Sequence, residues 1–529
     1  MSRQLPIIAV GIAAGGLLLV APLSGWPSLV RLDAVLLPGL LAVLVMLRPW
    51  SWGDEQWHFL ENWVPSRRFI AAGAIGLALF LFWLVLTRFQ SGSINAVDFT
   101  VYFDRPCFQT VHGRPLLVET GSFPSYSQRS LLAVHAYWAL LPLCSVYALV
   151  ATPFWLLAVS VIAVVAGAVH VLRIMRHVGS SGVLAVSTAL VLALNDNTAR
   201  TLNYGFHPEV LYVWFVPWLL DAGLRRKRLQ FAAAAIACIL VKEDAFMPLV
   251  AAAVVLAFHN LRVMNRADVA LFLVCPVALA LTNLAIYFRY VVPALAPDGP
   301  MYANFWANYG PTVLTAAAGM ITQPGSVVSR TLSSGFFPSV MAPHLFLPLI
   351  GWRWTIGIAP IVLLYGASAN PQLRAFGIYY SIVLVPFLVI GASIGAMTAA
   401  RFLGSSARRF ELAAAAVLLL ATLLVGFGYS LRPWRAVNAA VPDSLALLSA
   451  EHFVLVQSEL YPHAGYDSRV QLLTPETLRS ARYEGAAILL APMVGAYLVD
   501  RNDLNRLRRL PSLRPMPAGL LAVRRAAAP

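Results

Sequence analysis

The chain has 529 residues, of which 59% are hydrophobic and only 12% are charged. Soluble domains carry about 25% charged and about 45–50% apolar residues, and part of every soluble domain must face water. The composition therefore excludes a soluble enzyme, and it excludes a disordered chain, which needs low hydrophobicity. The net charge of +15 is typical of a membrane protein whose Lys and Arg gather in cytoplasmic loops, so we expect no nucleic-acid partner.

Apolar runs follow one another from the N-terminus to residue 428 and predict an all-α polytopic membrane protein with about thirteen transmembrane helices. Several runs are shorter than the ~20 residues that cross a bilayer, so we expect their ends to extend into flanking polar residues. We expect residues 1–68 to form an N-terminal helical hairpin extension, without a signal-peptide cleavage site, and residues 69–430 to form the main transmembrane domain. In chain order the runs are Leu5–Ser24, Ala34–Leu47, Phe69–Thr87, Phe154–Leu172, Val183–Leu194, Val210–Leu220, Leu229–Val241, Ala245–Phe258, Val269–Ile286, Phe336–Ile350, Thr355–Tyr365, Gly377–Ala399 and Leu412–Gly428.

The basic residues predict the orientation, because Lys and Arg favour the cytoplasmic side of a membrane protein. With the N-terminus in the cytoplasm, alternation of the helices places every basic cluster inside. These clusters are Arg67-Arg68, Arg173 with Arg176, Arg225–Arg228, Arg262 with Arg266, and Arg408-Arg409. The outer face then holds the loops 88–153 and 289–335, the turns 195–209 and 242–244, and the tail.

The segment Leu131–Val150 is apolar, but His135 and Pro142 interrupt it. Counting it as a span would invert all later basic clusters. We therefore expect a helix that lies at, or dips into, the outer membrane surface.

The tail, residues 431–529, differs in kind because charged residues return and short apolar stretches alternate with turn residues. This pattern predicts a small α/β domain outside the membrane. The expected strands are Phe453–Val456, Ala486–Leu490 and Gly519–Val523, and the expected helical pieces are Ser444–Leu448 and Asp503–Leu507.

The spacing of the cysteines does not indicate a metal or cofactor site. Cys107, Cys144, Cys238 and Cys275 are scattered, without the spacing of a metal site. Three of them lie in or beside apolar runs, where we expect them to act as small hydrophobic residues. The sequence also lacks a P-loop, a zinc-protease motif and a dinucleotide fingerprint.

Ionisable residues near membrane depth are the strongest functional signal, because they are costly there unless paired or solvated. Four groups stand out on the predicted outer face. Each of the four groups named below also has a purely structural interpretation. In the same order, these are a solvated loop, helix capping, an extramembrane turn and an interfacial aromatic belt. The groups are Asp98 with Asp104, Arg105, His112 and Arg114; Asp196 and Arg200 with Phe206-His207-Pro208-Glu209; Lys242-Glu243-Asp244; and the aromatic stretch Tyr302–Tyr309 with Tyr379-Tyr380.

Phe206–Glu209 and the downstream Lys242-Glu243-Asp244 resemble the F-H-P-E and K-E-D motifs of an uncharacterised family of bacterial membrane proteins. Further likenesses extend over most of the chain from about residue 91. The family often has Asp before F-H-P-E, where this chain has Gly205. The likenesses are His112-Gly113-Arg114, His135 with Pro142, Tyr309-Gly310, Tyr379-Tyr380, Tyr461-Pro462-His463 and Arg469.

The family in turn resembles the GT-C glycosyltransferases, polytopic enzymes that use lipid-phosphate-linked sugars. In that superfamily the catalytic Asp or Glu lies in the first large outer loop, beside a surface-lying helix. The resemblance implies a GT-C-like transmembrane domain and an inverting sugar transfer at the outer face of the bacterial inner membrane. Polyprenyl-phosphate sugar would be the donor, membrane lipids would surround the enzyme, and the acceptor is not indicated.

In this hypothesis Asp98 is the general base that deprotonates the acceptor hydroxyl. Four cations are candidates to hold the leaving phosphate: Arg105, Arg114, Arg200 and Lys242. His207 would bind the phosphate or orient Asp98, and the acidic Glu209, Glu243 and Asp244 would hold the cations or bind sugar hydroxyls. The remaining expected substrate-binding residues are Asp104, His135, Tyr309 and Tyr380.

No cofactor is expected, although the carboxylates and the histidine could coordinate a divalent metal. Two other classes of protein remain open at this point. A transporter or flippase would also have charges and broken helices at membrane depth, and would distribute them over several depths. A non-catalytic assembly protein would use the tail as its interaction module.

Overall fold

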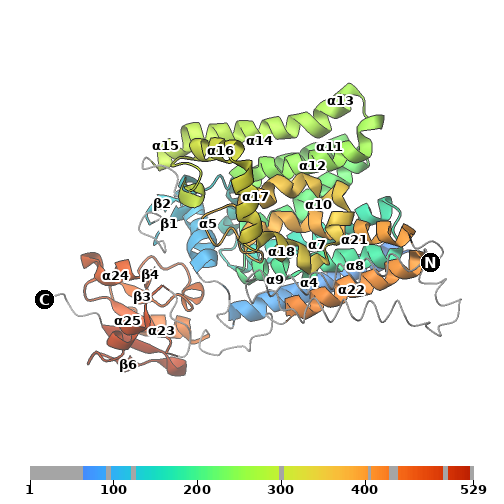
Figure 1. The fold of residues 1–529 in the computed structure, drawn as a ribbon. Helices are drawn as coiled ribbons and strands as arrows, with labels where there is room; N and C mark the ends of the chain where they lie inside the picture. The colour runs from blue at the N-terminus through green and yellow to red at the C-terminus, as the bar shows by residue number, and fades with distance from the viewer. Residues whose placement is uncertain are drawn as a thin grey trace.

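The computed structural model describes residues 63–90, 94, 97–120, 127–296, 303–402, 407–427, 439–492 and 498–524. The expected N-terminal hairpin of residues 1–68 and its two apolar runs therefore lie almost entirely outside the described residues. The described chain forms a block of packed helices with a smaller lobe, built from its C-terminal residues, beside one end of the block (Figure 1).

Six helical stretches of the described chain are long and apolar enough to cross a membrane. This establishes several membrane-spanning candidates, whereas the count of thirteen stays a prediction. The six stretches are α4 (Arg67–Gln90); α7 (Phe154–His177); α8 with α9 (Gly182–Leu194 and Asp196–Asn203); Glu243–Val263, which includes α12 (Phe246–Asn260); α13 to α15 (Arg266–Leu295), which includes α14 (Cys275–Ile286); and η14 with α21 (Tyr379–Leu384 and Val385–Phe402).

Further helices complete the block, of which α17 begins at Pro324 and α20 ends at Gly366. They are α5 (Arg105–Val111), α10 (Tyr212–Leu224), α11 (Arg228–Val241), α16 (Val313–Thr322), α17 (Pro324–Ser333), α18 (Phe336–Met341), α19 (Leu347–Ile350), α20 (Ala359–Gly366) and α22 (Ala407–Phe427).

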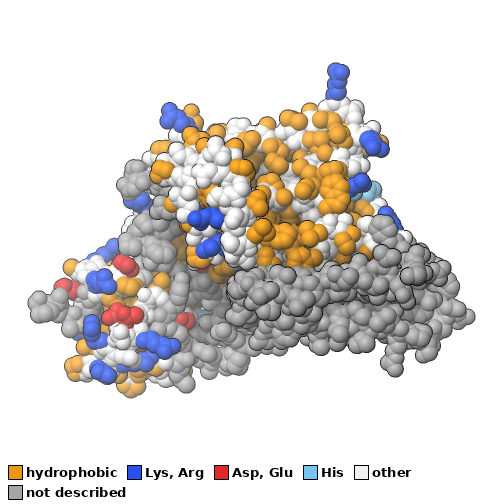
Figure 2. Space-filling model, viewed as in Figure 1, with side chains coloured by type: hydrophobic (Ala, Val, Ile, Leu, Met, Phe, Trp, Pro, Cys, Tyr) orange, Lys and Arg blue, Asp and Glu red, His pale blue; other side chains and the backbone are white. Residues whose placement is uncertain are grey.

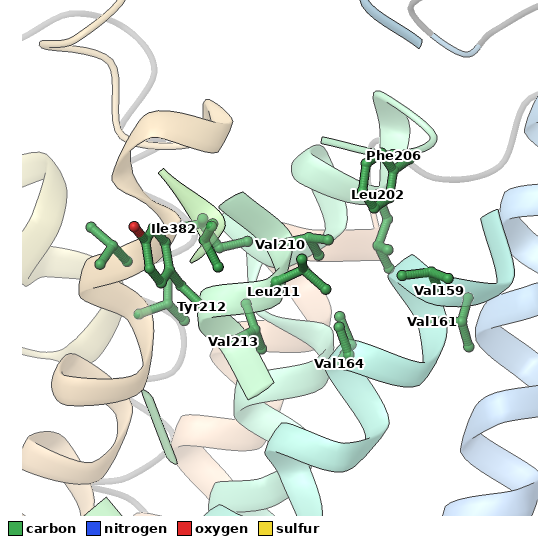
Figure 3. Packing of buried hydrophobic residues seen from close by; sticks show 14 of the residues in the cluster. Val159, Val161, Val164, Leu202, Phe206, Val210, Leu211, Tyr212, Val213 and Ile382 are labelled. Atoms are coloured by element: carbon green, nitrogen blue, oxygen red, sulfur yellow. The ribbon is translucent and has the colours of Figure 1, made fainter. Parts of the chain in front are cut away.

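Small residues let the central helices approach closely, which is how helices in a membrane gain packing contact. At Gly167 in α7, a Cβ atom would lie 2.0 Å from the backbone oxygen of Val213 in α10, so any other residue would force these helices apart. Buried residues of α7, of η5 (Pro208–Leu211) and of α10, among them Val164, Val210 and Val213, share one apolar cluster with Phe206 (Figure 3).

The expected surface helix over Leu131–Val150 is wrong as a single element. The structure has three short pieces instead: η3 (Leu131–Ala133), α6 (Leu140–Ser145) and η4 (Val146–Ala148). Pro142 lies in the first turn of α6, where its missing N–H is tolerated, and the chain is not helical between η3 and the residues leading into α6.

A disulfide joins Cys107 in α5 to Cys144 in α6, 37 residues later. The expectation that Cys144 acts as an isolated hydrophobic residue is therefore wrong. Cys238 is a free, buried thiol and Cys275 is a free, exposed one. The disulfide makes the first loop after α4 a cross-linked unit, to which the two-stranded pair β1 (Leu117–Val118) and β2 (Arg129–Ser130) also belongs.

The C-terminal lobe is a five-stranded sheet in the order β4-β3-β5-β7-β6. Strands β3, β4 and β5 are parallel, whereas β7 is antiparallel to β5 and β6. The predicted strands coincide with β3, β5 and β7 to within about two residues, whereas the very short β4 and β6 were not predicted. The elements are α23 (Val441–Leu447), β3 (Val454–Val456), β4 (Val470–Leu472), α24 (Pro475–Arg479), β5 (Ala487–Leu490), α25 (Arg501–Leu507), β6 (Arg514–Pro515) and β7 (Leu521–Arg524).

Alternate residues of the sheet face two different cores, as the pleat of a strand requires. Val454 and Val456 belong to the large cluster that also contains the helical block, whereas Leu455 belongs to a separate cluster inside the lobe. The lobe is thus packed against the helices and shows both basic and acidic side chains on its surface, while the coloured part of the helical block shows many apolar and few charged side chains (Figure 2).

Candidate functional site

The F-H-P-E motif turns the chain from α9 into α10. Gly205 has φ +78°, a left-handed conformation that favours glycine, and His207 is extended. Pro208 then starts η5 (Pro208–Leu211), where a proline without an N–H is well accommodated. This local geometry brings the side chains of His207 and Glu209 into the interior of the protein, where both are buried.

Glu209 is the centre of a buried polar cluster. Its Oε1 accepts a hydrogen bond of 2.8 Å from Lys242 Nζ and one of 3.3 Å from the hydroxyl of Tyr137, and its Oε2 pairs with Nδ1 of His207. Burial alone would raise the pKa of Glu209, but the neighbouring charges of His207 and Lys242 outweigh burial and hold this pKa well below its usual range. Glu209 is therefore a fixed anion that three donors hold in place.

Lys242 is fully engaged by protein groups. It lies in an extended conformation between α11 and η6 (Glu243–Ala245). Its Nζ is also 3.7 Å from Asp244 Oδ2 and 5.1 Å from the centre of the Tyr380 ring. A buried ammonium is tolerated because the carboxylates and the ring face replace its water.

Glu243 connects the K-E-D turn to the first loop. It accepts hydrogen bonds from His135 Nδ1 at 2.7 Å and from the backbone N–H of Ala136 at 2.9 Å. Asp244 accepts one from the hydroxyl of Tyr212 at 3.1 Å. Each acidic residue of this turn thus has a donor from a different element, so the turn joins three parts of the chain.

Asp98 lies in the first turn of η1 (Val97–Asp104), a π-helical segment that leads directly into α5, and it is half-buried. Burial, and next the negative charge of Glu209, raise the pKa of Asp98 to about 7. Further along η1, the ring of Phe103 lies 4.9 Å from that of His207. The structure therefore places η1 against the cluster around Glu209 and couples Asp98 to it electrostatically.

An aromatic layer covers His207. The ring of Tyr379 stacks on it at 3.5 Å with an interplanar angle of 15°, and Tyr204 meets Tyr379 edge-on at 5.1 Å. Tyr379 contacts Tyr380 in turn, at 4.4 Å. Because Tyr379 and Tyr380 start η14, the helical stretch that continues as α21 closes over the motif.

A family model, described as "Predicted membrane protein (DUF2079)", matches residues 88–463. The chain belongs to this family. The match confirms the family likeness that the F-H-P-E and K-E-D motifs indicated, and no functionally curated protein matches the chain. The matched region contains every residue of the cluster around Glu209, so this DUF2079 member carries its candidate site within the family's common part.

Two solved structures are similar to the chain over most of its length. The crystal structure of ArnT from Cupriavidus metallidurans bound to undecaprenyl phosphate is 11% identical, with 88% of this chain and 99% of that chain covered and a TM-score of 0.47. ArnT from the same organism in the apo state is 12% identical, with 86% and 100% covered and a TM-score of 0.44.

Two of the predicted substrate-binding residues of this DUF2079 protein lie at the contact with the C-terminal lobe. Asp104 accepts hydrogen bonds from Tyr147 and Tyr466. The guanidinium of Arg105 binds Glu119 at 2.6 Å and two backbone carbonyls of the lobe. The structure does not bring these two side chains into the cluster around Glu209.

The other predicted residues outside the cluster are dispersed. Arg114 is exposed at the end of α5. Arg200 forms an ion pair of 2.8 Å with Asp196, its neighbour one turn earlier in α9. Tyr309 is buried in a separate apolar cluster, with the guanidinium of Arg330 6.0 Å from its ring centre. Of the four predicted cations, only Lys242 lies in the cluster with Glu209.

Several members of the cluster were not among the predicted site residues. Tyr137 and Phe103 contact His207 or Glu209, and Tyr379 covers His207. Tyr379 had a signal, since it adjoins Tyr380. Tyr137 had a weaker one, since it lies two residues after His135. Within the part of the chain that the structure describes, no group of three or more His, Cys, Asp or Glu is placed to hold a metal ion.

Proposed function

We propose that the protein is an inverting membrane glycosyltransferase that moves a sugar from a polyprenyl-phosphate donor to an acceptor hydroxyl. The proposal rests chiefly on one observation: a half-buried carboxyl, Asp98, whose pKa of about 7 suits a general base, lies in η1, which packs against the buried polar cluster around Glu209. Burial and the negative charge of Glu209 both raise the pKa of Asp98, which is the direction expected of a carboxyl that acts as a base near neutral pH.

In the proposed reaction Asp98 takes the proton of the acceptor hydroxyl, and the resulting oxygen nucleophile attacks the anomeric carbon of the sugar. The bond from that carbon to the phosphate oxygen breaks, the configuration inverts, and polyprenyl phosphate leaves with the bonding electron pair. Glu209, Lys242 and His207 are positioning residues in this scheme, since they engage one another and fix the surface on which η1 packs.

The site is proposed to face the outer side of a bacterial inner membrane, with the N-terminus in the cytoplasm. The disulfide between Cys107 and Cys144 supports this orientation, because disulfides persist in oxidising compartments outside the cytoplasm. It lies in the first loop after α4, the loop that also carries Asp98. The basic turn Arg225–Arg228 would then face the cytoplasm, as the positive-inside rule requires.

The test is Asp98→Asn in purified protein reconstituted in liposomes with undecaprenyl-phosphate monosaccharides of several sugar types and a bacterial membrane extract as the acceptor source. The measurement is the release of undecaprenyl phosphate. We expect wild-type protein to release it from at least one donor and Asp98→Asn to lower the rate by about 100-fold or more, the range that general bases supply.

The matched control is Asp443→Asn, which makes the same chemical change at an exposed carboxylate in the first turn of α23. It should keep wild-type rates. Transfer that survives Asp98→Asn at a similar rate would overturn the assignment of the base. Movement of intact donor across the bilayer without release of undecaprenyl phosphate would instead indicate a flippase.

A further inference from the structure

We propose that residues 461–471, which run from the connection after β3 into the first two residues of β4, form a clamp that positions Asp98, so that the C-terminal lobe contributes to the active site. The inference rests on the proposed function insofar as Asp98 is the base. It goes further in assigning a role to Tyr466 and Asp104, which lie away from the cluster around Glu209. We call residues 461–471 the clamp loop.

The clamp loop forms a hydrogen bond with Asp104, the last residue of η1. The Oδ1 atom of Asp104 accepts a hydrogen bond of 2.8 Å from the hydroxyl of Tyr466 in the clamp loop and one of 2.7 Å from the hydroxyl of Tyr147 in η4. Asp104 is only 3% exposed, so water cannot replace either donor. Hydrogen bonds to a buried ionised group are among the stronger polar contacts in proteins.

Arg105, the next residue, strengthens the grip. Its two terminal nitrogens donate to the backbone oxygens of Gly465 at 2.8 Å and Asp467 at 3.0 Å, and its guanidinium lies 5.1 Å from the ring centre of Tyr461. These three partners all belong to the clamp loop. A planar guanidinium that spans two carbonyls fixes direction as well as distance.

Two ring contacts and one more hydrogen bond complete the interface between the clamp loop and the segments around η1. Tyr466 stacks on Phe108 of α5 at 4.4 Å with an interplanar angle of 7°, and the ring of His463 lies 4.7 Å from that of Phe89 at the end of α4. At the far end of the clamp loop, the hydroxyl of Thr120 binds the amide oxygen of Gln471. The clamp loop therefore holds the elements on both sides of Asp98, α4 before it and α5 after it.

Through η1, the position of Asp104 also determines the position of Asp98, the candidate base. Asp98 lies in the first turn of η1 and Asp104 at its end, and the helical segment between them is continuous. Phe99 and Phe103 are buried between the two ends, with Phe103 against His207. A helical segment moves as a unit, so a shift of Asp104 relative to the helical block moves Asp98 relative to Glu209.

The clamp loop is itself held firmly. The clamp loop follows β3 and ends within β4, and these two strands pair in parallel register. Val456 of β3 and Val470 of β4 belong to the large apolar cluster shared with the helical block. A loop anchored in this way has little freedom to follow η1. The geometry thus suits a positioning device, in which the sheet sets the place of the base.

The first arm of the test measures position without any substrate. Asp98→Cys in a Cys275→Ser background introduces one accessible thiol, since Cys107 and Cys144 are disulfide-bonded and Cys238 is buried. The rate of reaction with methyl methanethiosulfonate is then compared with and without Tyr466→Phe, which removes one hydroxyl from Asp104. We expect the rate to change at least about threefold, because the thiolate responds to its local electrostatics and access.

The matched control is Tyr483→Phe, which removes a hydroxyl from a buried tyrosine in the separate cluster of the same lobe. It should leave the reaction rate of the introduced thiol unchanged. The clamp would be overturned if neither Tyr466→Phe nor Tyr483→Phe changed the reaction rate of the introduced thiol. It would also be overturned if both variants changed this rate equally.

The second arm uses the transfer assay on the otherwise unchanged protein. Tyr466→Phe should lower kcat by about tenfold while KM for the undecaprenyl-phosphate donor stays constant, because misplacing a catalytic group by about 1 Å costs up to ~100-fold. If wild-type protein transfers nothing but the thiol rate responds to Tyr466→Phe, the proposed function fails and the clamp stands. If transfer depends on Asp98 but neither readout responds to Tyr466→Phe, the clamp fails alone.

Discussion

Lys242 Nζ lies 2.8 Å from Glu209 Oε1, and this hydrogen bond joins the K-E-D turn to the F-H-P-E motif 33 residues earlier. Both side chains are buried, with exposures of 6% and 3%. Each motif begins a short helical turn, so the ion pair fixes the relative position of the chain segments that enter α10 and α12. The two motifs therefore form one structural unit.

Breaking this pair from one side should destabilise the protein strongly. Lys242→Met removes the ammonium that pairs with Glu209 and leaves this buried anion with His207 and Tyr137. Glu209→Gln leaves Lys242 with the more distant Asp244. Each variant should therefore lower the free energy of unfolding by about 3–5 kcal/mol. The measurement is thermal unfolding in detergent of both single variants and of the double variant. The double variant should lose less than the sum of the two single variants, and additive losses would contradict the pairing.

The sequence predicted this part of the site because a buried charge requires a partner. Three adjacent charges between two apolar runs indicated that Lys242 needs an acidic neighbour, and Glu209 was among the candidates. The same reasoning assigned Arg200 to those acidic residues as well, whereas its ion-pair partner is Asp196 on its own helix. The rule that a buried charge requires a partner predicts that a partner exists, but it does not predict which residue the fold places there.

Other contacts left no pattern in the sequence. Arg105 binds backbone carbonyls about 360 residues away, and any residue type has such a carbonyl. The cysteines of the disulfide lie 37 residues apart in segments of different character. The expected helix over Leu131–Val150 likewise followed from the apolar side chains of that run. The structure has three short helical pieces there, and the points at which they begin and end are set by tertiary contacts.

The transfer reaction should depend on pH through Asp98. Burial and the charge of Glu209 raise its pKa to about 7, and a base must be ionised to act, so kcat/KM should fall as the pH drops below about 7. Burial also raises the pKa of Asp104, to about 6, and its protonation should steepen the fall below that pH. The measurement is the initial rate between pH 5 and 9, and a single acid limb near pH 4, typical of an exposed carboxyl, would contradict it.

The disulfide should be detectable chemically and should stabilise the loop that carries Asp98. Denatured protein without reductant should show two reactive thiols, those of Cys238 and Cys275, and reduced denatured protein should show all four. The combined variant Cys107→Ser and Cys144→Ser should lose about 2–4 kcal/mol of stability. Cys238→Ser serves as the control for a buried thiol outside the disulfide, and four thiols in the unreduced protein would refute the bond.

The glycine before F-H-P-E should resist replacement by aspartate. Gly205 has φ +78°, and a Cβ atom would lie 3.0 Å from the Phe99 ring and 3.1 Å from Leu157. Gly205→Asp should therefore cost both the left-handed backbone penalty and a packing penalty, together about 2–4 kcal/mol. Because Phe99 follows Asp98 directly, the variant should also slow transfer.

Gly113→Asp provides the matched comparison for this prediction. Gly113 has nearly the same backbone angle, φ +79°, but a Cβ atom there has nothing within 4 Å. Its variant should pay only the backbone penalty, about 1 kcal/mol, which Asp reduces by bonding its own backbone. The difference between the two melting temperatures then reports the contacts of residue 205 with Phe99 and Leu157. Equal losses would mean that η1 does not pack against the F-H-P-E turn as described, and the electrostatic coupling of Asp98 to Glu209 would lose its structural basis.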